Sequence, residues 1–219
     1  YANNVIWPME ILCWLSNDIA SAFASWWKIR RISSEESQIR EPDHPAALET
    51  IKGQVRFEGV GFEREGHEIL KDISFTLEPG KTLGIMGMTG SGKTTLIQLL
   101  QRFYDVTEGR ILLDGTDIRQ LPLKQLRSSM AVVMQDVFLF SDTVSQNVRT
   151  GRKENLPEEN VEWAARAAGA HGFIKGLSRQ YETMIGERGV GLSGGQKQRI
   201  SIARAIAKET PVLILDDAT

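Results

Sequence analysis

One eight-residue stretch constrains this chain more than any other feature, because it matches the pattern G-x-x-x-x-G-K-[ST] in full. The stretch consists of Gly87, Met88, Thr89, Gly90, Ser91, Gly92, Lys93 and Thr94. Glycines in such a loop let successive backbone N–H groups turn inward around an anion, which is the geometry of a phosphate cradle. The pattern requires a strand before it and a helix after it, so it predicts an α/β fold.

The residues beside the loop supply that context. Thr82–Met86 is a short apolar run that predicts a strand buried on both faces, and Thr95–Leu100 has helical spacing. Lys93 would bring a mobile positive charge to the β- and γ-phosphates, and the Thr94 hydroxyl would ligate Mg²⁺. Thr95 could bond the α-phosphate side. We therefore expect a nucleotide site; the alternative is a glycine-rich turn with an incidental lysine.

The other elements follow from periodicity. Gln54–Glu58 and Ile73–Leu77 alternate polar and apolar residues, which predicts antiparallel strands with one solvated face. Elsewhere the patterns predict, in chain order, a strand at Arg110–Leu113 with a turn at Asp114–Gly115, a buried strand at Met130–Met134, helices at Leu156–Lys175 and Ser193–Ala207, and a buried strand at Val212–Leu215. Ser193 is placed to cap the second helix.

The N-terminal region differs in composition from the rest. Four of the five tryptophans lie in the first 27 residues, which contain no lysine or arginine, and the basic residues Lys28, Arg30 and Arg31 follow at once. This order predicts the end of a membrane helix entering the cytoplasm. Glu10 and Asp18 interrupt the apolar run, so an amphipathic helix packing on the domain or lying at an interface is the alternative. Residues 33–53 are polar and contain two prolines, which predicts a linker.

Charge and cysteine content exclude some classes. The net charge of −2 argues against a general nucleic-acid binder, which usually carries a basic excess. The single cysteine, Cys13, cannot form an internal disulfide, which favours a reducing compartment.

Two further motifs lie near the C-terminal end. Asp216 ends the predicted strand Val212–Leu215, where a phosphate-loop fold places its second Mg²⁺-handling carboxylate; the alternative is an aspartate that caps the next turn. A second glycine-rich loop consists of Leu192, Ser193, Gly194, Gly195 and Gln196.

Together these motifs resemble the nucleotide-binding domain of ATP-binding cassette (ABC) exporters, from about Val55 to the end of the chain. Gln135 matches the family's Q-loop, whose glutamine contacts Mg²⁺ and the attacking water, and Gly186–Gly189 matches a short exporter motif. The resemblance implies a P-loop NTPase core with a parallel sheet, an antiparallel β-subdomain and a helical signature subdomain over about residues 136–192. It assigns residues 54–219 to this domain and residues 1–32 to the cytoplasmic end of the last transmembrane helix.

The resemblance also implies a mechanism and partners. Two such domains would meet head to tail, so that ATP on the phosphate loop of one is covered by Ser193, Gly194, Gly195 and Gln196 of the other. The cofactors would be ATP and Mg²⁺. The partners would be a second ABC half-transporter, identical or different, and a transmembrane domain in the cell membrane, with the nucleotide-binding domain in the cytoplasm and no nucleic acid involved.

Two residues depart from the family pattern. Asp217 stands where the family usually has the glutamate that serves as general base or water-positioner. Its side chain is one methylene shorter, and a misplacement of roughly 1 Å can cost about 100-fold in rate. This implies the weakly hydrolytic half of a heterodimer; Asp217 working adequately, or a non-hydrolytic regulatory module, are alternatives. Arg64 stands where the family has a tyrosine that stacks on adenine. Its planar guanidinium can stack on the base; substitution by Phe62 or His67 is the alternative.

Related ATPases fit less well. DNA-repair and chromosome ATPases insert a long coiled coil between the two loops, and here only about a hundred residues intervene. Separate importer subunits begin near their first strand, without a Trp-rich tail. The family's D-loop and switch histidine would follow Thr219, so the 219 residues alone are expected to be a fragment that hydrolyses ATP poorly. Nothing in the sequence identifies a transported substrate.

Overall fold

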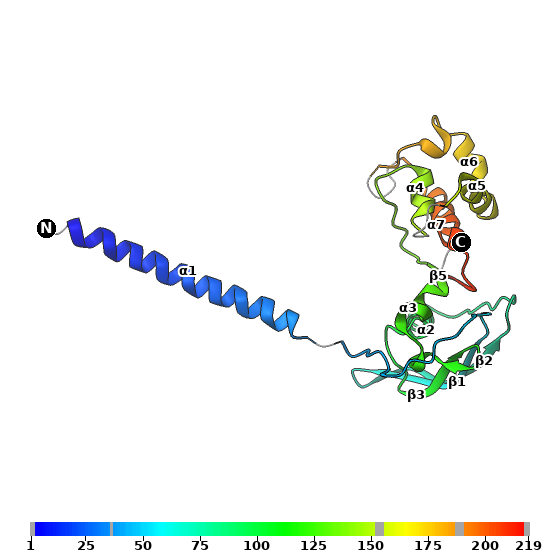
Figure 1. The fold of residues 1–219 in the computed structure, drawn as a ribbon, viewed down its shortest axis with the longest axis horizontal. Coiled ribbons are helices and arrows are strands. Elements are labelled where there is room, and N and C mark those ends of the chain that lie inside the picture. Colours follow the sequence, from blue (N-terminus) through cyan, green and yellow to red (C-terminus); the bar gives the residue numbers. More distant parts are fainter. Residues whose placement is uncertain (1–2, 36, 152–155, 187–190, 217–219) are drawn as a thin grey trace. The chain divides into compact units, whose positions relative to one another are not determined.

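The chain divides into two compact units, Tyr1–Arg40 and Glu41–Thr219 (Figure 1). The computed structural model describes residues 3–35, 37–151, 156–186 and 191–216. Asp217 and residues 187–189 of the exporter motif therefore lie outside the described residues.

The first unit holds one long helix, α1 (Asn3–Ser33). Its tryptophans are exposed, from 48% for Trp26 to 75% for Trp14, and Arg30 stacks over the Trp26 ring at 5.1 Å. Across the described ranges, no helix combines the length and the apolar run that a membrane crossing needs. Exposed apolar rings of this kind ordinarily mark a surface that contacts another protein or a membrane.

An antiparallel sheet forms one end of the second unit, in the strand order β2-β1-β3-β4. Its strands are β1 (Val55–Arg64), β2 (His67–Leu77), β3 (Glu108–Leu113) and β4 (Thr116–Asp117). Both predicted alternating strands are confirmed and are longer than expected. Phe57 opposes Phe75 across β1 and β2, with the rings stacked at 4.5 Å.

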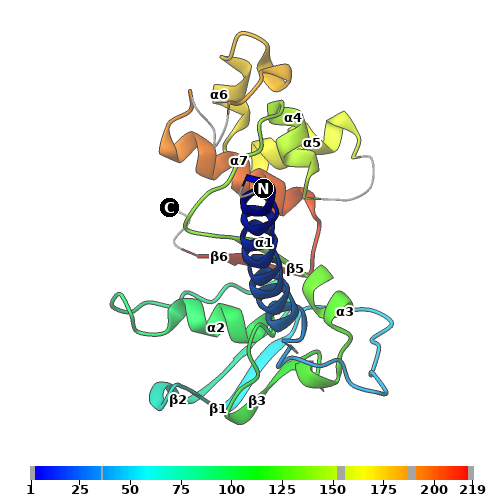
Figure 2. The ribbon, with the colours of Figure 1, turned by 90° about the vertical axis from the view of Figure 1, so that its left-hand side faces the viewer.

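Two helices lie between this antiparallel sheet and a pair of parallel strands described below, as Figure 2 shows. These are α2 (Lys93–Leu100) and α3 (Leu123–Ser128), and the short 3-10 helix η1 (Ile118–Gln120) leads into α3. Leu96 and Leu99 of α2 share one buried core with Val55 and Phe57 of β1. The helix predicted after the phosphate loop is therefore confirmed, and its apolar face fixes the loop against the sheet.

A parallel pair lies in the middle of the unit: β5 (Met130–Val133) and β6 (Val212–Leu215). Both predicted strands form, but the burial expected for Val212–Leu215 is wrong in part, because Leu213 and Leu215 are 45% and 51% exposed. The strand expected at Thr82–Met86 is also wrong, since this segment pairs with no described strand and Met86 is 90% exposed. An apolar run predicts burial, but burial requires neighbouring elements that the run itself does not encode. Among the described strands β6 pairs with β5 alone, so part of β6 stays exposed.

Helices build the opposite end of the unit (Figure 2). They are α4 (Val144–Arg149), α5 (Glu158–Ala167), α6 (His171–Lys175) and α7 (Gly194–Ala207), with the 3-10 helix η2 (Gln180–Glu182). We call this group the helical lobe; its own core includes Val148, Val161 and Ile200. The single helix expected at Leu156–Lys175 is two helices, because Gly169 takes a left-handed conformation (φ +65°) directly after α5.

The end of the predicted linker is attached along the β-rich end. We call residues 41–54 the strap. The carboxylate of Asp114 accepts from the backbone N–H groups of Lys52, Gly53 and Gln54 at 2.7 to 3.2 Å. Further along, the Gln125 amide bonds both the N–H and the carbonyl of Leu48. These bonds attach the strap to the domain at Leu48 and at residues 52–54.

Candidate functional site

Two glycines of the phosphate loop, Gly90 (φ +83°) and Gly92, lie in the left-handed region that favours glycine. Gly92 has φ +90°, and a Cβ there would lie 2.7 Å from Cδ2 of Leu70. A Cβ on Gly87 would lie 2.6 Å from Oγ of Ser91. The loop ends at the N-terminus of α2, where backbone N–H groups have no partner inside the helix. The exposed loop therefore presents backbone N–H groups of the kind that bind an anion.

Lys93 lies folded over this loop. Its Nζ donates to the carbonyl oxygens of Gly87 at 2.8 Å and Met88 at 2.9 Å. An ammonium group has three N–H donors, and these two bonds use two of them. The group can therefore offer its positive charge and a further donor to an anion held by the loop.

Thr94 and Asp216 meet although they are 122 residues apart in sequence. Thr94 Oγ1 donates to Asp216 Oδ2 at 3.2 Å. The backbone N–H of Asp216 in turn bonds the Val133 carbonyl at 2.9 Å, so the β5–β6 ladder fixes the aspartate. A hydroxyl and a carboxylate side by side are oxygen donors of the kind that Mg²⁺ prefers. Beside the glycine-rich loop Gly87–Thr94 and its lysine, this donor set fits a magnesium–nucleotide group.

Gln135 lies at the same edge of the parallel pair. Val133 and Leu215 are paired, and the chain leaves both strands in the same direction toward Gln135 and Asp216. Gln135 is exposed. In open α/β sheets, ligands bind outside the carboxyl ends of parallel strands, so this edge carries the polar groups that a phosphate ligand would meet.

The second glycine-rich loop caps α7. Ser193 Oγ accepts from the N–H of Gln196 at 3.3 Å, and Gln196 Oε1 accepts from the N–H of Ser193 at 2.9 Å, which is a capping box. The predicted cap is therefore confirmed, and Gln196 contributes to it. Gly194 and Gly195 are exposed, and a Cβ on either would meet open space. Leu192 packs against the core of the helical lobe.

Arg64 has a partner that the sequence did not reveal. Its guanidinium lies over the Tyr104 ring at 4.8 Å, and Nη1 donates to the Tyr104 hydroxyl at 2.9 Å. Phe62, one of the two suggested substitutes, is 5% exposed, and its ring centroid lies 5.7 Å from that of Tyr104. His67 pairs with Arg64 across the β1–β2 hairpin. The sequence near Tyr104 gives no sign of its contact with Arg64, because the contact joins β1 to the loop before β3.

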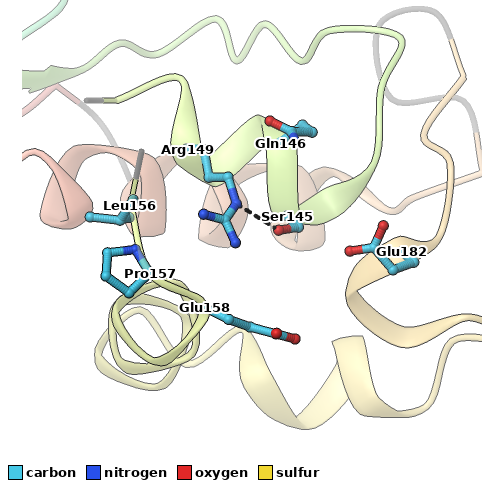
Figure 3. A pocket seen from close by; sticks show the side chains of 7 residues that line it. All are labelled: Ser145, Gln146, Arg149, Leu156, Pro157, Glu158 and Glu182. Atoms are coloured by element: carbon cyan, nitrogen blue, oxygen red, sulfur yellow. Dashed lines mark hydrogen bonds between the residues drawn. The ribbon is translucent and has the colours of Figure 1, made fainter. Parts of the chain in front are cut away.

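A separate hollow of about 450 Å³ lies in the helical lobe (Figure 3). It opens between α4, η2 and the start of α5, and Arg149 donates to Ser145 Oγ there at 3.1 Å. Seven residues line it: Ser145, Gln146, Arg149, Leu156, Pro157, Glu158 and Glu182. None of the expected site residues is among them, so this hollow is distinct from the cradle.

Comparison with known proteins agrees with this geometry. A profile described as "ABC transporter" matches residues 70–219, from the middle of β2 past Asp216. The chain belongs to the ABC transporter family. Its phosphate loop, capped glycine-rich loop and β5–β6 edge all lie within or beside that match.

Several relatives of this ABC domain are exporters. The chain is 43% identical to the putative multidrug export ATP-binding/permease protein YgaD of Bacillus subtilis, covering 100% of this chain and 38% of that protein. It is 43% identical to the beta-(1-->2)glucan export ATP-binding/permease protein NdvA of Brucella suis, covering 37% of it. A bacterial Atm1-family ABC exporter with ATP bound has a TM-score of 0.84 and 37% identity, over 97% of this chain and 37% of that one. The α/β architecture expected for an ABC exporter domain is confirmed, and the chain spans a little over a third of these relatives.

Proposed function

We propose that this ABC domain binds magnesium–ATP on the loop Gly87–Thr94 and hydrolyses it to drive export across a membrane. The observation that carries the proposal is the hydrogen bond between Thr94 and Asp216. It joins the phosphate loop to the acidic end of β6, which is the pairing that a magnesium-dependent nucleotide site requires.

Each residue of the site has a role in this proposal. The backbone N–H groups from Gly87 to Thr94 hold the phosphates, Lys93 neutralises their charge, and Thr95 bonds the α-phosphate side. Thr94, Asp216 and Gln135 hold the magnesium ion, which neutralises developing phosphate charge when bound. Gln135 also orients the attacking water.

The capped loop Ser193–Gln196 serves a second ABC domain. Its glycines are exposed at a helix N-terminus, where hydrogen-bond donors and the helix dipole favour an anion. The similar solved structure is an Atm1-family ABC exporter with ATP bound. We propose that this chain forms a head-to-tail pair with a second ABC domain, in which the capped loop covers the partner's ATP. The partner is a second half-transporter, different in sequence or identical.

Asp217 makes the chain's own site a slow one in this proposal, because the family's glutamate would reach farther toward the attacking water. A different partner with a glutamate would then supply the fast site. A non-hydrolytic regulatory module is the second candidate, and the shorter side chain of Asp217 is the feature that favours it.

The N-terminal unit completes the proposal. The exposed tryptophans of α1 and its basic end fit the cytoplasmic end of a membrane helix, over residues 1–32. Residues 33–53 then link it to the nucleotide-binding domain, residues 54–219, whose helical subdomain spans about 136–192. The domain would lie in the cytoplasm at the cell membrane.

Isothermal titration with magnesium–ATP tests the binding step. We expect Lys93→Ala to abolish measurable binding and Lys81→Ala, which removes an exposed lysine before the loop, to leave it unchanged. Equal binding by the two variants would refute the site. Single-turnover hydrolysis in the presence of the partner half then separates the two candidates: Asp217→Glu should raise the rate, and no gain would exclude the weakened-site hypothesis.

A further inference from the structure

A polar cluster in the helical lobe joins α7 to α4 and to the segment 138–140, which lie 57 and 66 residues before Arg204 at the bonded residues. At its centre is Asn147 of α4, which is fully buried. Its Oδ1 accepts from the N–H of Phe140 at 2.9 Å, and its Nδ2 donates to the carbonyl of Phe140 at 3.0 Å and to that of Thr143 at 3.1 Å. The side chain therefore holds both backbone groups of Phe140.

Arg204 of α7 completes the cluster. Its Nε donates to the Asn147 carbonyl and its Nη2 to Asn147 Oδ1, both at 2.8 Å, and its Nη1 donates to the Phe138 carbonyl at 2.9 Å. The guanidinium also lies over the Phe140 ring at 5.5 Å. One side chain thus uses three nitrogens to hold α4 and the segment 138–140 against α7.

The chemistry of this cluster depends on the shape of the guanidinium. The acceptors named above are neutral, and burial lowers the pKa of Arg204. A planar fork reaches three oxygens at once, whereas the compact ammonium of lysine cannot reproduce that geometry. The two acceptor oxygens of Asn147 lie in partly buried bonds, and a buried acceptor left without its donor costs more than the hydrogen bond itself contributes. The bond to the Phe138 carbonyl is exposed, and it adds the segment 138–140 to the same guanidinium. We therefore expect these segments to move together.

The cluster lies between two loops of the proposed ATP sites. Phe138 is three residues after Gln135, and Arg204 is eleven residues after Ser193 along the same helix. Eleven residues of α-helix span about 16 Å. The end of α4 also rests directly on α7, since a Cβ at Gly151 would collide with the backbone oxygen of Arg204. The helix α7 therefore connects the Arg204 contacts at one of its ends to the capped loop at the other.

We propose that Arg204 is a positioning residue that ties the segment after Gln135 to α7, so that nucleotide binding in this chain's own site moves the capped loop Ser193–Gln196. This inference rests on the proposed function. It assigns Arg204 no contact with nucleotide. Its effect passes through Phe138 and Asn147 to one end of α7, and through the helix to the other.

Hydrogen exchange measured by mass spectrometry tests the coupling. The 219-residue chain is kept monomeric, as checked by analytical ultracentrifugation, so that no partner covers the capped loop. Magnesium–ATP should change exchange in peptides covering 136–142 and 191–198, by at least about fivefold for a coupling of ordinary strength. In Arg204→Lys the first change should persist and the second should fall below about twofold. Arg166→Lys, the same substitution on exposed α5, should behave as wild type.

Phe140→Leu provides a milder second variant, because it removes the ring under the guanidinium and keeps the backbone bonds. It should reduce the response of 191–198 and carries the test if Arg204→Lys does not fold. If Arg204 has only a structural role, the variants should show faster hydrogen exchange throughout the domain, and the ATP-dependent change at 191–198 should remain. That result would overturn this inference and leave the proposed function standing. Failure of the wild-type chain to bind magnesium–ATP would overturn the proposed function and the inference with it.

Discussion

Replacing Gly92 with alanine tests whether the phosphate loop is packed against β2 as described. Gly92 has φ +90°, a region in which a residue with a Cβ is strained by about 1 to 2 kcal/mol. The added Cβ would also lie 2.7 Å from Cδ2 of Leu70 and 3.4 Å from the carbonyl oxygen of Ile69. Leu70 is 5% exposed within the main core, so it has little room to yield. Overpacking of this kind costs about 1 to 3 kcal/mol.

The two costs together predict a loss of about 2 to 5 kcal/mol in the free energy of unfolding. Gly66→Ala is the matched control, because Gly66 has φ +78° with no atom within 4 Å of a new Cβ. It should lose about 1 to 2 kcal/mol through backbone strain alone. Urea denaturation followed by circular dichroism measures both losses.

The same substitution should weaken nucleotide binding. If the displaced loop loses one charge-assisted hydrogen bond to phosphate, worth about 1.5 to 3 kcal/mol, the dissociation constant rises by about 10- to 100-fold. Isothermal titration with magnesium–ATP should show this rise for Gly92→Ala and none for Gly66→Ala. Equal stabilities for the two variants, together with wild-type affinity, would refute the packing of the loop on Leu70.

Three further predictions concern other parts of the domain. Arg64→Tyr should lower the dissociation constant for ATP by about 3- to 10-fold in isothermal titration, because an aromatic ring stacks on a base without first leaving Tyr104. Asp114→Ala should cost about 2 to 4 kcal/mol in urea denaturation, since three backbone N–H groups of the strap lose their acceptor. Burial alone would raise the pKa of Asp117, but hydrogen bonds from Arg119 outweigh it and lower the pKa below 3.8. The ionised carboxylate therefore stabilises the fold above about pH 4. Asp117→Asn should have a smaller free energy of unfolding than wild type at that pH, and the difference should vanish as the pH falls further.

Each of these has a result that would count against it. Unchanged ATP affinity in Arg64→Tyr would mean that the base does not lie over residue 64. Asp43→Ala, at an exposed position within the strap, is the control for Asp114→Ala, and equal losses would show that the strap is not held by the Asp114 carboxylate. A stability difference between Asp117→Asn and wild type that stays constant down to pH 2 would contradict a lowered pKa at Asp117.

Local chemistry explains which elements could be predicted from sequence. The alternation in Gln54–Glu58 and Ile73–Leu77 reflects a sheet with one solvated face, and the cap at Ser193 needs only residues three apart. The strand predicted at Thr82–Met86 is wrong because burial on both faces depends on neighbouring strands, which an apolar run does not encode. The break at Gly169 was missed because a single glycine within a helical pattern is often tolerated.

The sequence by itself determined the phosphate loop, the capped loop and the aspartate that ends β6, since each is a short motif whose geometry follows from its own residues. Only the tertiary structure decided that Thr94 meets Asp216, that Tyr104 holds Arg64, and that Arg204 holds the segment after Gln135. These contacts join residues 40, 66 and 122 positions apart. Such distances in sequence are closed by the packing of sheet, helices and loops around shared cores, and no local pattern records which partners that packing brings together.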